Sequence, residues 1–314
     1  MRRRLVSSAI FLLSAILPVF IFSCAPATPH PAQVNQAAID QPAPKPAKIA
    51  LVLGAGASRG FAHIGVIKVL EENHVPIDMV FGASAGSLVG SLFAYGYSPY
   101  DLQKMAISIK KGDLTDLAIP DGGFIKGQKL QDFVDHAVRN TPMEKLKIPF
   151  YAVATDIDSG KEVIFGKGDT GMAVRASCSI PGVFQPVSIG GQMYVDGGVT
   201  SPLPVEEARR YGASLVIAVD ISSDLDTGQP DGITGILFKT VGIMYAELEK
   251  AGASQADVVI RPKVGNIGSG DFSKRNLAIM EGEKAAWQAM PEIRRKLNAL
   301  REAGRLPAYS SLAR

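Results

Sequence analysis

The chain has 314 residues, of which 46% are hydrophobic and 20% charged, a balance typical of a globular protein with one large core or two smaller ones. Its formal net charge is +3, and the three arginines at positions 2–4 account for that excess. A nearly neutral remainder, with no run of basic residues interleaved with aromatic ones, argues against nucleic acid as a partner.

The first 23 residues have the pattern of a secretory signal. Arginines at positions 2–4 are followed by an apolar run over residues 6–22. The run ends at Ser23-Cys24, and a small residue followed by cysteine at this place resembles the lipobox of bacterial lipoproteins, whose cysteine carries lipid. We therefore expect residues 1–23 to be a lipoprotein signal peptide and Cys24 to be lipidated. The alternative is an uncleaved anchor helix, since the apolar run is close to the lower limit for crossing a bilayer.

Such a lipoprotein is expected in the bacterial cell envelope, anchored by its lipid, and by resemblance at the outer membrane facing the periplasm. Residues 24–47 are rich in alanine, proline and glutamine, so they cannot bury apolar surface and are expected to form an extended tether. Residues 48–314 are expected to form one folded domain. With Cys24 lipidated, Cys178 is the remaining cysteine, so no disulfide is expected and Cys178 is predicted to be a small core residue.

The tether is followed by a predicted strand over residues 48–53, a glycine loop over 54–60 and a helix over 61–72. Glycines between a strand and a helix let backbone N–H groups converge on an anion. Two functions fit this loop: binding of a dinucleotide, or an oxyanion hole for a nucleophile elsewhere in the chain. Arg59 either orients the loop through backbone carbonyl groups or is a surface cation, and His63 is expected to be an ordinary helix residue.

A second glycine turn follows the apolar run at residues 77–81. The motif Gly82-Ala-Ser84-Ala-Gly86 lies between this predicted strand and a predicted helix over residues 88–95. A Gly-x-Ser-x-Gly motif in that position is typical of a nucleophile elbow, a strained turn that lifts the serine Oγ above the sheet and in front of the helix N-terminus. The alternative is a glycine-rich turn with a helix-capping serine. An oxyanion hole beside Ser84 explains both glycine loops, so we favour it over the dinucleotide site.

Ser84 needs a base to activate it. In the usual α/β-hydrolase order the histidine follows the acid, but no histidine lies beyond His136. We therefore expect a carboxylate that acts directly, or a histidine out of the usual order. Asp196 is the leading candidate, because it ends a predicted strand and enters a glycine turn. Asp121 ranks below it because no strand precedes it, and Asp156, which ends another apolar run, is the third choice. The alternative for all three is an ordinary turn aspartate.

Residues 100–139, which follow the elbow, are predicted to be mostly helical. Their apolar side chains are expected to cover the sheet, with a lid over the site as the alternative. Trp287, near the end of the chain, is expected to face the core. Alternating strands and helices predict an α/β fold with helices on both faces of a mostly parallel sheet. Beyond Asp196 the periodicity predicts elements over residues 204–212, 214–220, 233–250, 257–261 and 276–305.

With the glycine loop, the elbow and Asp196-Gly-Gly198, the chain resembles the patatin-like phospholipases, of the bacterial type similar to the catalytic domain of neuropathy target esterase. Residues 154–160 and 175–187 resemble two further blocks of that family, in the family's order. The resemblance implies a three-layer α/β/α fold with a mostly parallel central sheet. It also implies that residues 48–314 are a hydrolase domain.

The resemblance assigns roles to the residues of the motifs. It implies a serine–aspartate dyad with Ser84 as nucleophile and Asp196 as base, acting on a phospholipid or another ester lipid without metal or cofactor. Ala55 stands where many members carry a third consecutive glycine. The implied oxyanion loop comprises Gly54, Gly56, Ala57 and Arg59, and the implied elbow glycines are Gly82 and Gly86.

Two other hypotheses stay open at this point. A nucleotide-binding oxidoreductase domain would bind NAD(P) and leave Ser84 unreactive to a fluorophosphonate, and a non-catalytic lipoprotein would use the fold only for binding. The sequence contains no His-Glu-x-x-His motif, Gly-Lys-Ser/Thr loop or cysteine–histidine cluster, so no metal or nucleoside triphosphate site is expected. The acyl chain, the headgroup and the oligomeric state are left open.

Overall fold

The computed structural model describes residues 44–116, 125–222 and 232–307. The expected signal peptide, Cys24 and most of the expected tether lie outside these ranges, as does Asp121. Within the described ranges, no helix has both the length and the hydropathy that a membrane span requires.

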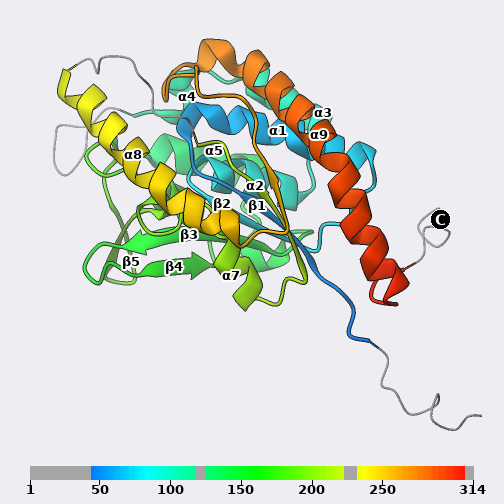
Figure 1. Ribbon diagram of the computed structural model, residues 1–314. Helices are drawn as coiled ribbons and strands as arrows, with labels where there is room; N and C mark the ends of the chain where they lie inside the picture. The colour runs from blue at the N-terminus through cyan, green and yellow to red at the C-terminus, as the bar shows by residue number, and fades with distance from the viewer. Residues whose placement is uncertain (1–43, 117–124, 223–231, 308–314) are drawn as a thin grey trace, which may run out of the picture. The chain divides into compact units, whose positions relative to one another are not determined.

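An eight-stranded sheet forms the middle layer of the described fold (Figure 1). Its strands are β1 (Ile49–Leu53), β2 (Met79–Ala83), β3 (Phe150–Asp156), β4 (Glu162–Phe165), β5 (Val187–Ile189), β6 (Gln192–Asp196), β7 (Leu215–Val219) and β8 (Val258–Ile260). Neighbours follow the order β5-β6-β3-β2-β1-β7-β8, and β4 also pairs with β3. Strands β3, β2, β1, β7 and β8 are successive parallel neighbours. The pairs β3–β4, β3–β6 and β5–β6 are antiparallel. The predicted α/β fold with a mostly parallel sheet is confirmed.

The central strands are buried on both faces, which explains their unbroken apolar sequences. Every residue of β1 is buried, and so is every residue of β7. Successive side chains of a strand point to opposite faces. Leu51 therefore belongs to the large core on one side of the sheet, and Val52 belongs to a smaller core on the other.

Helices cover both faces of the sheet (Figure 1). They are α1 (Phe61–Glu72), α2 (Ala85–Tyr95), α3 (Pro99–Ser108), α4 (Lys111–Leu114), α5 (Gln128–Ala137), α6 (Thr170–Ser177), α7 (Val205–Arg210), α8 (Gly232–Ser254) and α9 (Arg275–Glu302), with 3₁₀ turns at Ala57–Gly60, Met143–Lys145, Gly197–Val199 and Phe272–Lys274. The core that contains Leu51 is completed by α1, α2, α3, α5, α6 and α9. Helices α7 and α8 contribute to the core that contains Val52. The fold is therefore three-layered, as the resemblance implies.

Two expectations about exposure are wrong. Trp287 in α9 is 50% exposed, and Ile107 in α3 is 54% exposed. Helix α9 packs closely along α1, where a Cβ on Gly282 would lie only 2.1 Å from the Ala62 carbonyl oxygen. Ala286, one turn after Gly282, is fully buried in the same core. Because each residue advances about 100° around a helix, Trp287 is turned away from that contact.

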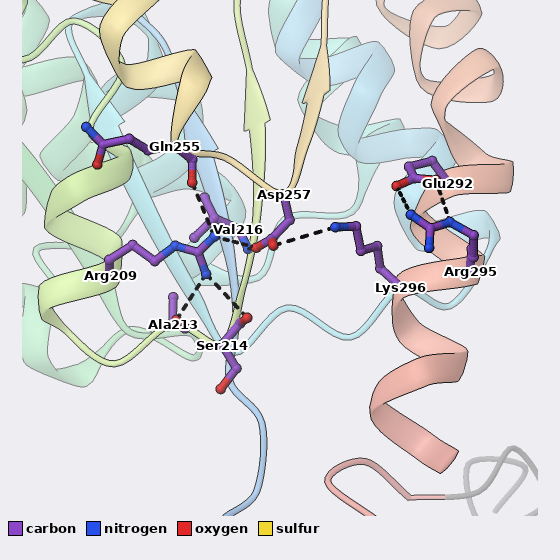
Figure 2. Close-up of polar contacts among 9 residues, drawn as sticks. All are labelled: Arg209, Ala213, Ser214, Val216, Gln255, Asp257, Glu292, Arg295 and Lys296. Carbon is purple, nitrogen blue, oxygen red and sulfur yellow. Dashed lines mark hydrogen bonds and ion pairs between the residues drawn. The ribbon is translucent and has the colours of Figure 1, made fainter. Parts of the chain in front are cut away.

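Arg209 on α7 braces the N-terminal ends of β7 and β8 (Figure 2). Its Nη2 donates to Asp257 Oδ2 at 2.6 Å, and the same oxygen accepts the Val216 N–H at 2.8 Å. A further hydrogen bond runs from Arg209 to the Gln255 carbonyl oxygen at 3.2 Å. These contacts stabilise one end of the sheet. The carboxyl ends of the parallel strands lie at the other end, where ligand sites form in α/β folds.

Candidate active site

The predicted nucleophile and base meet across strand β3. Ala83, the last residue of β2, is paired with Val153 of β3, and the next residue, Ala154, is paired with Asp196 at the end of β6. Ser84 and Asp196 therefore come together from opposite sides of one strand, although 112 positions separate them in the chain. The Ser84 Oγ donates a hydrogen bond of 2.6 Å to Asp196 Oδ2.

Ser84 lies in a strained turn, as the Gly-x-Ser-x-Gly motif predicts. Its φ of 51° and ψ of −124° are rare for a residue with a side chain and cost about 1–3 kcal/mol. The flanking glycines make room for this turn. A Cβ on Gly86 would lie 2.0 Å from the Leu53 carbonyl oxygen, and one on Gly82 would lie 2.5 Å from the Gly86 carbonyl oxygen. The turn places Ser84 at the N-terminus of α2.

Neighbouring hydroxyl groups hold this strained backbone in place. The Ser84 N–H donates to Ser177 Oγ at 3.0 Å, and Ser177 Oγ donates to the Val153 carbonyl oxygen at 2.6 Å. Ser87 Oγ donates to the Ser84 carbonyl oxygen at 2.7 Å. The polar groups of the turn are thus satisfied by buried side chains. This arrangement fixes the direction of the Ser84 side chain.

Asp196 has no exposed surface. Its Oδ1 accepts the Gly198 N–H at 2.7 Å, while its Oδ2 accepts from Ser84. Burial raises the pKa of Asp196 from 3.8 to about 6, and the hydrogen bonds from Ser84 and Gly198, together with the Tyr245 hydroxyl, oppose that rise. Asp196 is therefore ionised at neutral pH and is more basic than a solvated aspartate, which suits a proton acceptor.

The other candidates for the base have different partners. Asp156 accepts two backbone N–H groups, two and three residues farther along, both at 3.0 Å, and is a turn residue. His63 Nε2 donates to the Gly54 carbonyl oxygen at 2.9 Å. Burial lowers the pKa of His63 to about 4, so it is a neutral helix residue that anchors the glycine loop. In the part of the chain that the structure describes, Ser84 Oγ therefore contacts a carboxylate and no histidine.

The backbone N–H groups of the glycine loop are of two kinds. Those of Gly54 and Arg59 each donate to a backbone carbonyl oxygen at 3.1 Å. Those of Gly56 and Ala57 have no hydrogen bond within the described residues, and Ala57 lines the cavity beside Ser84. Of the four residues expected in the oxyanion loop, Gly56 and Ala57 are thus the two whose N–H groups are available to an anion.

Ala55 fits into the loop without strain. It is buried against Ala83 and Tyr245, and its φ is not positive, so the loop accommodates its methyl group. Arg59 is partly buried rather than a fully solvated cation. Burial raises the pKa of Glu249 in α8 well above its usual range, and Arg59 is one of the groups that oppose this rise. Arg59 therefore lies close to α8.

Ala85 was not among the predicted site residues. It follows Ser84 directly as the first residue of α2, and it lines the same cavity. N–H groups in the first turn of a helix have no acceptor inside the helix. The backbone N–H of the residue after an elbow serine is a usual oxyanion donor, so the motif itself contained the signal.

A cavity of about 290 Å³ begins at Ser84, and its walls are almost entirely apolar. Cys178 lines it and is only 8% exposed, which agrees with its predicted place in the core. Burial raises the pKa of the Cys178 thiol far above its usual value, so the thiol is neutral. The apolar side chains between the elbow and Asp196 thus line a cavity as well as covering the sheet. Those from α2, α3 and α5 include Leu88, Leu92, Leu102, Met105, Leu130 and Phe133.

The fold and this site define an α/β protein with a nucleophile elbow of the hydrolase type, in which a carboxylate contacts the serine. The chain belongs to the patatin-like phospholipase family, whose model matches residues 51–209. The resemblance seen in the motifs is confirmed, and the family is one of lipid hydrolases. Membership favours the oxyanion interpretation of the first glycine loop over the dinucleotide interpretation.

Two proteins with similar sequences carry the name NTE. An uncharacterised NTE family protein of Mycobacterium tuberculosis is 38% identical over 178 residues, which cover 56% of this chain and 49% of that protein. Lysophospholipase NTE1 of Yarrowia lipolytica is 30% identical over 299 residues, which cover 84% of this chain and 20% of that protein. The match spans about half the length of the mycobacterial relative and a fifth of the yeast enzyme.

Among solved structures, VipD from Legionella pneumophila has a similar fold. The TM-score is 0.56 with 12% sequence identity, and the match covers 79% of this chain and 67% of that one. At this identity the likeness concerns the fold alone. It agrees with the three-layer arrangement described above.

Replacing Asp196 by asparagine is expected to stabilise the fold at high pH. The pKa of Asp196 in the folded state, about 6, lies above the ordinary value of 3.8, so the folded state binds this proton more tightly than the unfolded state. Ionisation of Asp196 above pH 6 therefore lowers the free energy of unfolding. Asp196→Asn removes this cost, and we expect a gain of about 1–3 kcal/mol at pH 8 that disappears as the pH falls through 6 toward 4. Urea unfolding at both pH values measures it.

Asp156→Asn is the matched control, because hydrogen bonds from backbone N–H groups lower the pKa of Asp156. Its carboxylate stabilises the fold above the ordinary pKa, so this variant is expected to lose stability at pH 8. A loss of stability at pH 8 in Asp196→Asn would contradict the assignment of a destabilised buried carboxylate.

Proposed function

We propose that this protein is a serine acyl hydrolase of lipid esters, with Ser84 as nucleophile and Asp196 as general base. The observation that carries this proposal is the 2.6 Å hydrogen bond between the two side chains, at a strained elbow that opens into an apolar cavity. The similarity to the lysophospholipase of Yarrowia lipolytica supports a lipid ester as the substrate. A dinucleotide would gain little from walls that are almost entirely apolar.

The geometry supports an acyl-transfer mechanism. Ser84 Oγ attacks the ester carbonyl carbon while its proton passes to Asp196 Oδ2, and the carbonyl oxygen becomes the oxyanion. The N–H groups of Gly56 and Ala57, with that of Ala85 at the start of α2, stabilise this charge. Asp196 then returns the proton to the leaving alkoxide, which departs as an alcohol. Water, deprotonated by Asp196, cleaves the acyl-enzyme and regenerates the Ser84 hydroxyl.

The cavity is the proposed binding site for the acyl chain. Its volume of about 290 Å³ is at the lower end of the range for ligand pockets. It therefore suits one acyl chain rather than a whole diacyl lipid. We place the ester carbonyl at Ser84 and the chain between α2, α3 and α5, which leaves the headgroup outside the cavity.

The N-terminal pattern leads to a proposal about location. The signal peptide at residues 1–23 and a lipidated Cys24 would tether the domain to the bacterial cell envelope, and a lipid substrate would then be close at hand. The sequence between Cys24 and the domain would act as the tether. We assign the protein to the outer membrane, facing the periplasm.

Ser84→Ala is expected to abolish labelling by a fluorophosphonate and to lower ester hydrolysis by at least about 10³-fold, because loss of a nucleophile costs up to about 10⁶-fold in related chemistry. Ser91→Ala is the control, since Ser91 is buried on the same helix and its Oγ bonds to the Leu88 carbonyl oxygen. Labelling of Ser84→Ala would refute the assigned nucleophile. A folded wild type without labelling or turnover would favour the non-catalytic lipoprotein.

Ala106→Phe is expected to shorten the cavity, because Ala106 on α3 is 5% exposed and lines it. The kcat/KM for p-nitrophenyl palmitate should fall about tenfold or more, with little change for the butyrate ester, since each misfitting methylene costs about 1–3 kcal/mol. Ile107→Phe, one residue on and 54% exposed, is the control. Equal losses for both esters would argue against an acyl-chain site here.

Cys24→Ala is expected to remove incorporation of an alkynyl fatty acid and to release the protein from the membrane fraction. The test is metabolic labelling followed by separation of inner and outer membranes. Unchanged labelling of Cys24→Ala would contradict the lipidation site. Recovery of the wild type only in the inner membrane would overturn the outer-membrane location.

A further inference from the structure

Tyr245 on α8 lies against the turn that follows Asp196. The side chain is 9% exposed and packs with Ala55 of the glycine loop and Ala83 of the elbow. A Cβ on Gly198 would lie 2.3 Å from Tyr245 Cε2 and 2.8 Å from its hydroxyl oxygen. Gly198 is the residue whose N–H already donates to Asp196 Oδ1. The Tyr245 hydroxyl is therefore close to the Asp196 carboxylate, with which it interacts.

This hydroxyl is a buried donor next to Asp196. It has no hydrogen-bond partner of normal geometry within the described residues. Burial, and then the charge of Asp196, raise the pKa of Tyr245 well above its usual value, so the phenol keeps its proton. The same hydroxyl lowers the pKa of Asp196. A neutral phenol can stabilise a carboxylate only by donating to it.

We propose that Tyr245 is a positioning residue for the base: its hydroxyl donates to the Asp196 carboxylate, keeps it ionised, and turns Oδ2 toward Ser84. This inference rests on the proposed function, because it assigns to α8 a part in activating the same serine. In a serine triad, an aspartate orients the histidine. Tyr245, from the opposite face of the sheet, plays the corresponding part for Asp196. The hydroxyl gives up no proton, so each transfer still runs between Ser84 and Asp196.

Two further ionisable groups, Cys178 and Glu249, face the pair. Cys178 faces Asp196, and burial holds its pKa far above neutrality. Glu249, one turn after Tyr245 on α8, also faces the phenol. Burial and Asp220 raise the pKa of Glu249 well above its usual value, against the opposing influence of Ser222 and Arg59. Cys178 therefore stays neutral near pH 6, whereas Glu249 is a second carboxylate with a raised pKa in this region.

Tyr245→Phe tests the proposal, because it removes the hydroxyl and keeps the ring against Gly198. The measurement is the rate of fluorophosphonate labelling, and kcat/KM for p-nitrophenyl butyrate, from pH 5 to pH 9. In the wild type both should rise through about pH 6, where Asp196 ionises. In the variant the rise should move to higher pH by at least about 0.5 unit, because a donor to the charged form is lost. The loss should thus be about twofold or more at pH 6 and should shrink toward pH 8.

Tyr194→Phe is the matched control, since Tyr194 is a buried tyrosine two residues before Asp196 whose hydroxyl donates to Gln192. It should keep the wild-type profile. A Tyr245→Phe profile that coincides with the wild type, or that falls equally at every pH, would overturn the role of Tyr245 while leaving the dyad intact. Should Tyr245→Phe fold poorly, Tyr245→Gln, which restores a neutral donor, must recover the wild-type profile or the proposal fails. A wild type that neither labels nor turns over would refute the proposed function instead.

Discussion

The site depends on the hydrogen bond from Ser84 to Asp196, whose carboxylate is shielded from water. An aspartate in water has a pKa near 3.8 and is a poor base, whereas burial brings this one to about 6. In the proposed mechanism, burial thus supplies part of the basicity that an imidazole provides in a serine triad. The same burial makes the ionised group costly to hold, so every nearby donor matters. The Gly198 N–H and the Ser84 hydroxyl each donate a hydrogen bond to the Asp196 carboxylate.

A change of strand direction makes the contact feasible. Strands β2 and β3 are parallel, so Ser84 emerges where β2 ends, but β6 runs antiparallel to β3 and ends beside Ala154 within the sheet. The chain must then turn closely over β3. A Cβ on Gly197 would lie 2.0 Å from the Val153 carbonyl oxygen, so this glycine is required by the close approach of two backbones. The Asp-Gly-Gly motif is therefore required by the packing of the sheet as well as by the contact between Asp196 and Ser84.

The two halves of the site face different layers of the fold. Ser84 opens into a cavity between α2, α3 and α5, whereas the turn after Asp196 is covered by Tyr245 of α8. In the proposed function, acyl-chain binding and proton transfer are thus assigned to different helices. On that proposal, a change in cavity shape alters which acyl chain fits without altering the basicity of Asp196.

The sequence alone determined the α/β alternation, the elbow around Ser84 and the glycine loop, because these follow from local periodicity and sterics among residues close together in the chain. It also indicated Asp196 as the partner of Ser84, from its local context and because no histidine follows His136. Tertiary structure alone decided which loop N–H groups stay open, that Trp287 faces outward, and that Tyr245 covers the base. These features arise from strand register and from contacts between distant elements, and a side chain's neighbours across a sheet leave no periodic trace in the chain.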